Sequence, residues 1–289
     1  MPIDKRIVAT AIARIGIGGR PVMAHSSLKA LGVVVGGASA VVGALLDRRR
    51  TVLVPAFSSG FGVPMPSDRA PLQRNGVDPG FEGPTVGVRR VYTPACGEID
   101  RDMGAVAAAI VGMPDGARGM HPLNSFAAAG PDARKLVAGQ TGMDVYAPIR
   151  ELADRGGYVV LMGVGLESMT ALHLAEQMAG RRLFRRWANG PDGEAMELSV
   201  GGCSRGFGAL DPVLSKVERT QRVGNGLCRA FPLRELLTLA SAAIASRPEV
   251  TRCTRADCVR CADAVAGGPV QAPPIRLRGR RTGIQMQSE

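Results

Sequence analysis

The sequence predicts an α/β fold in which helices cover a parallel or mixed β-sheet. The first observation is a strand–turn–helix–strand unit, because residues 21–25 and 51–57 are apolar runs typical of buried strands and residues 39–46 are typical of a helix. The second is a strand over 158–162, a glycine turn, and a helix over 171–179. A chain of 289 residues is also long enough to bury a large core.

Between these units lies a segment that is too long to be a plain connector. Residues 58–100 are rich in Gly, Pro, Ser and Asp, and loops of this length are usually functional or mobile. We therefore predict a single α/β domain over residues 1–266 with this inserted loop, and a basic, flexible tail over 267–289. The remaining expected elements are helices within 1–18 and over 103–111, 132–138, 149–155 and 233–246, and β-structure over 196–200.

The net charge is strongly positive, at +11, which is compatible with a nucleic-acid or anionic-ligand partner. The basic residues are dispersed, however, apart from clusters at 48–50, 181–186 and 276–281. The clusters do not form a basic stripe studded with aromatic residues, and no recognition-helix pattern accompanies them. We therefore expect no nucleic-acid partner. An anionic cofactor would use only a few of these arginines.

The longest charge-free run, residues 30–46, does not predict a membrane span. It is shorter than the roughly 20 residues that cross a bilayer, and four glycines interrupt it. The N-terminus also lacks the pattern of a signal peptide. We expect no membrane association, a cytoplasmic location, and a monomer or homodimer. In that compartment cysteines are reduced or metal-bound.

Residues 158–180 carry the main functional prediction. A glycine turn at 163–165 ends the strand, and Thr170 is expected to cap the following helix. His173 then lies in the first helical turn, on the same face as Glu176. The positive end of the helix dipole disfavours imidazolium, so a neutral His173 can act as a general base. The alternative is a histidine that only caps or packs.

The other two histidines support a functional interpretation. His25 and His121, like His173, lie at strand-like or glycine-bounded junctions and outside charged surface runs. A second glycine turn over 33–37 precedes the helix at 39–46, and its free N–H groups can bind phosphate or carbonyl oxygens. It matches neither G-x-G-x-x-G nor a P-loop, so a purely structural turn is the alternative.

Gly202 to Gly206 match the G-x-S-x-G nucleophile elbow of α/β-hydrolases. In that fold the catalytic histidine follows the serine along the chain. Here the last histidine, His173, precedes it. The match therefore does not predict a hydrolase.

A cysteine cluster near the C-terminus has the spacing of a metal site. Cys258 and Cys261 are separated by two residues, which is half of a typical tetrahedral zinc site, and Cys253 lies nearby. Either Cys203 or Cys228 can supply the fourth thiolate. We favour Cys203, since its neighbouring glycines allow a close approach. We expect one structural zinc, because four thiolates leave no open position; the alternative is a set of reduced cysteines without metal.

Several motifs occur together in a recognisable order. In that order they resemble the aminoglycoside 3-N-acetyltransferase family of antibiotic acetyltransferases, over about residues 21 to 262 and including residues 201–204. All three histidines fall on motif positions. The fold implied is a mixed β-sheet sandwiched between helical layers. The motifs are His25-Ser26-Ser27-Leu28, residues 32–37, the strand at 51–57, Met120-His121-Pro122 through Gly130, and residues 163–176.

The resemblance implies acetyl transfer from acetyl-coenzyme A to the 3-amino group of a 2-deoxystreptamine antibiotic, and hence antibiotic resistance. His173 then matches the catalytic histidine, and Glu176, Thr170 and His121 accompany it. A substrate amine is mostly ammonium at neutral pH and must lose a proton to attack the thioester, which agrees with a general base. No acyl-enzyme is then required.

The resemblance also implies a coenzyme site. Backbone N–H groups of the glycine turn are expected to stabilise the thioester oxygen as it gains charge. Arg118 is the expected phosphate partner. The segments that resemble the pantetheine and pyrophosphate site contain His25, Ser26, Ser27, Val33, Val34, Val35, Gly36 and Gly37.

Two motifs depart from the family pattern. Where the family often has Arg-Ser-x-His-Pro, residue 119 is glycine, which removes a hydroxyl expected to touch the cofactor. Where it often has His-Asp-x-Asn-Thr, residues 166–170 are Leu-Glu-Ser-Met-Thr, which leaves the substrate open. The alternative functions are a coenzyme-A-dependent acyltransferase acting on a different amine in a biosynthetic pathway, and a non-catalytic, zinc-stabilised binding protein.

Aminoglycosides are polycations, which a protein of charge +11 repels at long range. Binding therefore requires a local acidic cleft, with the 58–100 segment as one wall. Simple solvation is the alternative for each acid. The candidates are Asp68, Asp78, Glu82, Asp100, Glu167 and Glu176, of which Asp68, Glu82, Glu167 and Glu176 are our predicted substrate-binding residues.

Overall fold

The computed structural model of the protein describes residues 2–68, 76, 78 and 90–266. Its helices are α1 (Lys5–Ile15), α2 (Leu28–Leu31), α3 (Gly37–Leu46), α4 (Gly104–Val111), α5 (Ala133–Val137), α6 (Ala147–Asp154), α7 (Ala171–Met178), α8 (Asp211–Leu214), α9 (Leu233–Ser246) and α10 (Val259–Ala266). Its strands are β1 (Val22–Ser26), β2 (Val52–Pro55), β3 (Gly62–Val63), β4 (Ala117–Arg118), β5 (Phe126–Ala129), β6 (Tyr158–Met162), β7 (Phe184–Asn189), β8 (Ala195–Val200), β9 (Arg219–Val223) and β10 (Gly226–Pro232).

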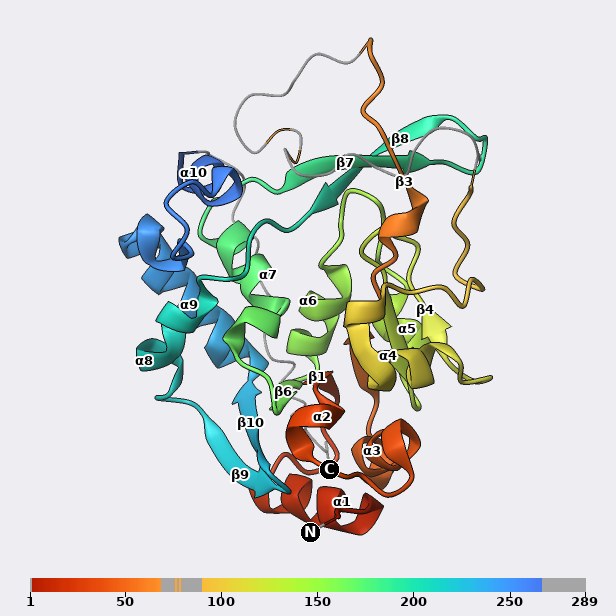
Figure 1. Ribbon diagram of the computed structural model, residues 1–289, viewed down its shortest axis with the longest axis vertical. Coiled ribbons are helices and arrows are strands. Elements are labelled where there is room, and N and C mark those ends of the chain that lie inside the picture. Colours follow the sequence, from red (N-terminus) through yellow and green to blue (C-terminus); the bar gives the residue numbers. More distant parts are fainter. Residues whose placement is uncertain (1, 69–75, 77, 79–89, 267–289) are drawn as a thin grey trace, which may run out of the picture.

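The main sheet has seven strands in the order β4-β5-β2-β1-β6-β10-β9 (Figure 1). The central strands β2, β1 and β6 are parallel, and their outer neighbours β5 and β10 pair antiparallel to them. The expected mixed sheet is therefore confirmed. Val22 pairs with Tyr158 and Ser26 with Met162, so β1 and β6 end at the same edge of the sheet. In α/β folds, ligand sites lie outside this carboxyl edge.

Alternate residues of the central strands face two separate apolar cores. Met23 and Leu161 pack with residues of α5, α6, α7 and α9. Val22 and Val160 pack with residues of α1, α3 and α4 on the other face. Strands buried on both faces are apolar along their whole length, which explains the uninterrupted apolar runs in the sequence. The expected helical layers on both faces of the sheet are confirmed.

A second, three-stranded sheet, β3-β7-β8, crosses the end of the molecule away from α1 (Figure 1). Its edge strand β3 belongs to the segment predicted as a long loop. Arg185 of β7 accepts a hydrogen bond from the N–H of Asp78 at 3.0 Å and donates its own to Gly76 O at 2.8 Å. Residues 62–63, 76 and 78 of the 58–100 segment are thus hydrogen-bonded to β7. The single-domain assignment stays a prediction, and its tail, 267–289, lies outside the described residues.

Most predicted elements are confirmed to within a few residues. The strand at 158–162 and the helix at 233–246 have the predicted bounds, and the helix predicted over 171–179 is α7. Strands β5, β9 and β10 and helix α10 are not predicted. The reason lies in their residues: β5 contains three alanines, which disfavour strands, and β9 is a largely polar edge strand.

Within the described residues, no helix combines the length and the apolar character that crossing a bilayer requires.

Candidate active site

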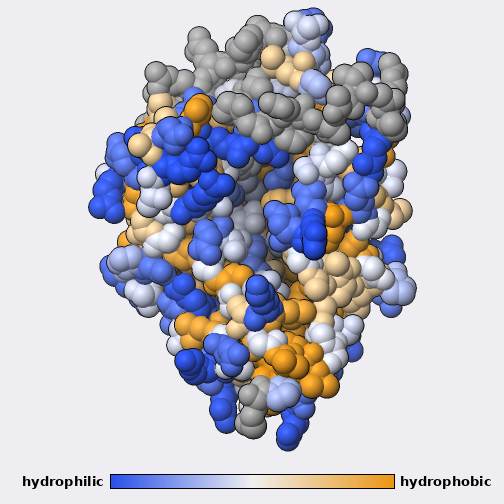
Figure 2. All heavy atoms as spheres, viewed as in Figure 1, coloured by the Kyte–Doolittle hydropathy of each residue, from blue (hydrophilic) through white to orange (hydrophobic). Residues whose placement is uncertain are grey.

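A cavity of about 670 Å³ lies where β1 and β6 end. Figure 2 shows this face of the molecule hollowed near its centre, with hydrophilic side chains around the hollow. The cavity walls come from the end of β1, the start of α4, the turn before α7 and the glycines after β8. Its polar lining includes His25, Ser26, Ser27, Lys29, Asp100, Asp102, Glu167, Ser168, Thr170, His173 and Arg186.

His173 lines this cavity from the first turns of α7 and is only 8% exposed. Its Nδ1 lies 2.8 Å from Oε2 of Glu176, which confirms that the two side chains share a helix face. A carboxylate can only accept, so Nδ1 donates and Nε2 carries the lone pair. Nε2 makes no hydrogen bond within the described part of the chain. His173 therefore presents the geometry of a general base held in one tautomer.

Glu176 is held from behind by two residues that the sequence did not indicate. Its Oε1 lies 2.5 Å from an Arg181 guanidinium nitrogen and accepts from the Thr251 hydroxyl at 3.2 Å. Arg181 also donates to Thr251 Oγ1 at 2.7 Å and to the carbonyl of Pro248. A buried carboxylate needs such partners because burial disfavours an unpaired charge. Both carboxylate oxygens of Glu176 have partners within the protein, and Glu176 does not line the cavity, so this geometry does not favour its predicted role in substrate binding, which stays a prediction.

The His173 ring is fixed by aromatic and glycine contacts. Tyr146 stacks on it, with ring centroids 6.4 Å apart and planes 10° apart, and Phe207 meets it edge-on at 4.8 Å. A Cβ at Gly201 would lie 2.7 Å from Cδ2 of the ring, so the backbone approaches the imidazole as closely as glycine permits. These contacts leave the imidazole little room to rotate.

Thr170 does not act as predicted. It occupies the N-cap position, but its backbone is already helical and its side chain makes no capping hydrogen bond. Its carbonyl instead accepts from the N–H of His173 at 3.1 Å. Thr170 lines the cavity.

The end of β1 contributes His25, Ser26 and Ser27 to the cavity, as the coenzyme prediction required. Burial lowers the pKa of His25 to about 4, so this ring is neutral near pH 7. Its Nε2 is buried and has no hydrogen-bond partner among the described residues. Ser27 has a structural role as well, since its Oγ accepts from the N–H of Ala30 at 3.3 Å and caps α2.

His121 does not reach the cavity and is completely buried. Its Nε2 lies 2.9 Å from Ser199 O, and its Nδ1 accepts from the backbone N–H groups of Leu123 and Asn124. Both ring nitrogens are therefore hydrogen-bonded within the protein. Desolvation lowers the pKa of His121 to about 4. The ring joins the His-Pro turn to β8, which is a structural role, and the predicted catalytic role of His121 stays a prediction that this geometry does not favour.

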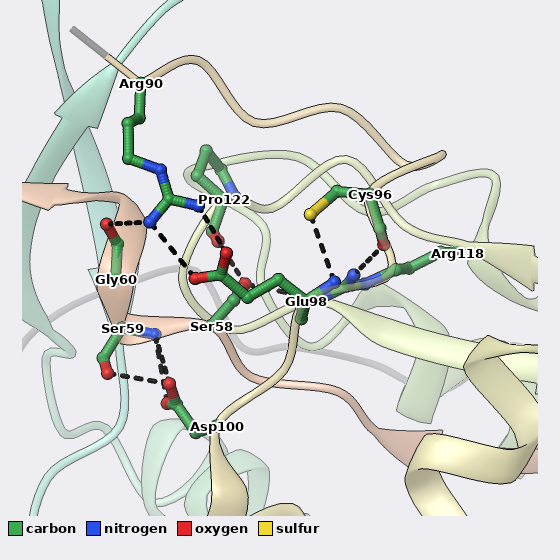
Figure 3. Close-up of polar contacts among 9 residues, drawn as sticks. All are labelled: Ser58, Ser59, Gly60, Arg90, Cys96, Glu98, Asp100, Arg118 and Pro122. Atoms are coloured by element: carbon green, nitrogen blue, oxygen red, sulfur yellow. Dashed lines mark hydrogen bonds and ion pairs between the residues drawn. The ribbon is translucent and has the colours of Figure 1, made fainter. Parts of the chain in front are cut away.

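Arg118 is also hydrogen-bonded within the protein, for example to the carbonyl of Cys96 (Figure 3). Its Nε donates to Ser125 Oγ at 2.9 Å, its Nη1 donates to the carbonyl of Cys96, and its Nη2 donates to the carbonyls of Ala56 and Glu98. The residue is 8% exposed and does not line the cavity. All three guanidinium nitrogens are hydrogen-bonded within the protein, which does not favour a phosphate contact, and the phosphate-binding role of Arg118 stays a prediction.

Gly119, where the family often has serine, is explained by its neighbour Gln140. A Cβ at position 119 would collide with the Gln140 side-chain amide. That amide donates to the carbonyls of Asn124 and Val145, both at 2.9 Å. A side chain at 119 would therefore meet Gln140 rather than a cofactor.

The glycine turn over 33–37 lies outside the cavity lining. The N–H of Val35 donates to Ile3 O at 2.7 Å, and that of Gly37 donates to Val34 O at 3.0 Å. These two donors are therefore engaged within the protein, which does not favour their predicted contact with a thioester oxygen. Val33 and Val35 have exposed side chains, which suit contact with an apolar ligand segment. The binding of coenzyme A by residues 33–37 stays a prediction.

The acidic residues predicted to bind substrate separate into two groups. Asp100 and Glu167 line the cavity, and Asp102, which the sequence analysis overlooked, joins them. Asp100 also accepts from Ser59 N and Oγ, which holds its carboxylate in place (Figure 3). Asp78 is buried between Arg186 and Arg260 and cannot face a substrate. Asp68 is exposed and outside the lining, and Glu82 lies outside the described residues.

The sulfur atoms of Cys203, Cys253, Cys258 and Cys261 lie within 4.8 Å of one another. The structure thus brings together the four cysteines that the sequence analysis grouped. Cys228, the alternative fourth ligand, is buried in β10 instead, where desolvation raises the pKa of its thiol to about 12.

Among known proteins, a sequence model described as aminoglycoside 3-N-acetyltransferase matches residues 23–245. The chain is 33% identical over 189 residues to aminoglycoside N(3)-acetyltransferase VII of Streptomyces paromomycinus, covering 62% of each protein. It is 27% identical over 261 residues to the N(3')-acetyltransferase-like protein YokD of Bacillus subtilis, covering 83% of this chain and 91% of YokD. The chain spans just under two thirds of the first two curated relatives it matches, 62% and 65%.

Solved structures show the same fold. The crystal structure of aminoglycoside acetyltransferase AAC(3)-IVa superposes with a TM-score of 0.72 at 22% identity, over 92% of this chain and 98% of the other. YokD from Bacillus subtilis gives 0.71 at 24%, over 85% and 100%. The family model covers well over half of the chain and includes all three motif histidines. This protein belongs to the aminoglycoside 3-N-acetyltransferase family.

Proposed function

We propose that this protein transfers the acetyl group of acetyl-coenzyme A to the 3-amino group of a 2-deoxystreptamine aminoglycoside, with His173 as general base. The observation that carries the proposal is the His173–Glu176 pair on the wall of an acid-lined cavity. Relatives support both substrates: AAC-IIIb has a solved complex with coenzyme A, and AAC(3)-IVa has one with gentamicin. Acetyl-coenzyme A as donor also fits the expected cytoplasmic location.

In this mechanism two protons leave the substrate ammonium. Water takes the first, and Nε2 of His173 takes the second as the nitrogen attacks the thioester carbonyl carbon. The carbon–sulfur bond then breaks, and the coenzyme A thiolate accepts the proton that His173 holds. Glu176 stabilises the imidazolium through Nδ1, while Arg181 balances the carboxylate. No acyl-enzyme forms.

Charge in the cavity supports a cationic acceptor. Asp100, Asp102 and Glu167 all line it, although the chain as a whole carries +11. Carboxylates grouped in a concave site attract a cationic ligand locally, even on a protein of unfavourable net charge. Lys29 and Arg186 line the same cavity and suit the anionic coenzyme.

The test is a thiol-release assay with acetyl-coenzyme A and a panel of aminoglycosides. Release that depends on one of them, with a single acetyl group added at the 3-amine, is the expected outcome. Coenzyme A binding without release would favour the second candidate, an acyltransferase that acts on a different amine. That candidate is motivated by Glu167 and Ser168, which line the cavity within the motif that departs from the family pattern. Neither turnover nor binding would leave a zinc-stabilised binding protein.

We also propose that the four-cysteine cluster binds one structural zinc ion. Tetrahedral zinc with bonds of about 2.3 Å places its sulfur ligands about 3.8 Å apart, and the four sulfurs already lie within 4.8 Å of one another. Four thiolates leave no open coordination position, so the metal would supply structure rather than chemistry.

Metal analysis of the purified protein should find one equivalent of zinc. The variant Cys258→Ser should lower this content strongly, while Cys228→Ala, at a cysteine outside the cluster, should not. A protein that is stable and free of metal would contradict the site.

A further inference from the structure

The cysteine cluster lies directly behind the catalytic carboxylate. A small cavity is lined jointly by Glu176, Arg181 and Thr251 of the carboxylate site and by Cys203 and Cys261 of the cluster. In sequence, Thr251 precedes Cys253 by two residues. The predicted metal site and the proposed base are therefore separated only by Glu176, Arg181 and Thr251.

Two short segments connect them. The first, residues 248–253, contains a 3₁₀ turn over Pro248–Thr251, which supplies the Thr251 hydroxyl to Glu176 and the Pro248 carbonyl to Arg181. The second, residues 201–206, begins with Gly201 against the His173 ring. The two segments touch where a Cβ at Gly206 would collide with the backbone of residues 251–252. Each segment carries one member of the cluster, Cys253 in the first and Cys203 in the second.

Residues 201–203 have no regular secondary structure, and the 3₁₀ turn over Pro248–Thr251 ends before Cys253. The backbone hydrogen bonds of a helix or strand therefore do not extend from these active-site contacts to Cys203 or Cys253. A cross-link through four thiolates provides an equivalent constraint, since it removes freedom from the chain that it closes.

We infer that the metal-bound cysteine cluster sets the position of the general base, by holding Thr251 and Arg181 against Glu176. Thr251 and Arg181 are then positioning residues, which act on the substrate only through Glu176 and His173. The inference rests on the proposed roles of His173 and zinc. It adds that the metal site and the acetyl-transfer site are coupled.

The experiment uses the zinc-loaded full chain and the variant Thr251→Val, which removes the hydroxyl and leaves every cysteine in place. Loss of a hydrogen bond to a buried charge should lower kcat roughly tenfold, with the KM for acetyl-coenzyme A nearly unchanged. Thr251→Ser should restore kcat to within about twofold, because it keeps the hydroxyl. The control Thr238→Val, at an exposed threonine of α9 that bonds only to its own helix, should leave kcat unchanged.

Coupling is tested by removing zinc with a chelator. If the metal acts through Thr251, the fold-changes in kcat caused by chelation and by Thr251→Val should not multiply. Thr251→Val should then change kcat less than about twofold in metal-depleted protein.

A second readout needs no turnover. The exchange-protected Nδ1–H proton of His173, identified by its absence in His173→Ala, should be visible by NMR in the zinc-loaded protein and broadened in Thr251→Val and after chelation.

The outcomes separate the inference from the proposed function. If the wild-type protein acetylates no aminoglycoside, the proposed substrate is wrong, and the NMR signal still reports the coupling. If Thr251→Val keeps both wild-type kcat and the sharp Nδ1–H signal, or if folded metal-depleted protein keeps full kcat, the inference is overturned.

Discussion

His173 and His121 are both buried, both lie on family motifs, and both have fixed rings, yet only one is suited to catalysis. In His121, Nε2 is hydrogen-bonded to Ser199 O, and Nδ1 accepts from two backbone N–H groups. In His173, only Nδ1 is hydrogen-bonded, to Glu176, and the residue lines the cavity. What distinguishes a catalytic from a structural histidine here is therefore a ring nitrogen left unused beside a cavity. Neither burial nor motif membership makes that distinction.

The sharpest test of this comparison is His173→Ala. Removing a general base should lower kcat by about 10²–10⁴-fold, while acetyl-coenzyme A still binds. Steady-state kinetics, together with calorimetry and circular dichroism to verify binding and folding, measure the effect. A folded His173→Ala protein with wild-type kcat would assign the base elsewhere.

Arg118→Lys should show that Arg118 stabilises the fold rather than binds the phosphate of the coenzyme. Lysine cannot reproduce the forked hydrogen bonds to Ser125 Oγ and the carbonyls of Cys96, Ala56 and Glu98, and it leaves buried acceptors without donors. We expect about 2–4 kcal/mol lower free energy of unfolding in urea. The KM for acetyl-coenzyme A should stay near the wild-type value. A large rise in KM at unchanged stability would restore the phosphate-binding role.

His121 should affect stability through pH. Its pKa is about 4 in the folded protein against 6.5 in the unfolded chain, so below pH 6.5 the unfolded state binds the proton first. The stabilisation is fully present above pH 6.5 and is lost as the pH falls toward 4.

His121→Asn keeps an acceptor for the backbone N–H groups but has no group that titrates in this range. We expect it to be about 1–2 kcal/mol less stable at neutral pH, since the bond to Ser199 is lost. Urea unfolding at pH 7 and pH 5 should show a smaller loss of stability for the variant than for the wild type. Equal losses would mean that His121 does not contribute to the pH dependence.

The smallest expected effect is at His25, whose Nε2 is buried at the cavity without a described partner. If this nitrogen binds coenzyme A, His25→Asn should raise the KM for acetyl-coenzyme A several-fold, by about 1 kcal/mol, with kcat within twofold. An unchanged KM would instead mean that His25, like His121, has a structural role.

The predictions from sequence succeeded where the signal was local. The strand, glycine turn and helix over 158–179 were confirmed, and so was the pairing of His173 with Glu176, because residues three apart on a helix share a face. The cysteine grouping was also confirmed, including the distant Cys203, because flanking glycines allow a close approach.

The predictions failed where a residue's partners lie far away in the chain. Arg181 looked like part of a basic surface cluster, and nothing near Thr251 indicated an active-site role. Arg118 was expected to bind phosphate, but its guanidinium donates to three other chain segments, at residues 56–58, 96–98 and 125.

By itself, then, the sequence determined the α/β class, the helix that presents His173, the family, and the four cysteines that gather. These depend on periodicity and on short spacings. Only the tertiary structure decided which histidine faces the cavity, which acids line it, and which residues hold Glu176. Hydrogen bonds between segments 70 or more residues apart, such as Arg181 with Thr251, depend on how the sheet and its helices pack. No local pattern in the chain encodes that packing.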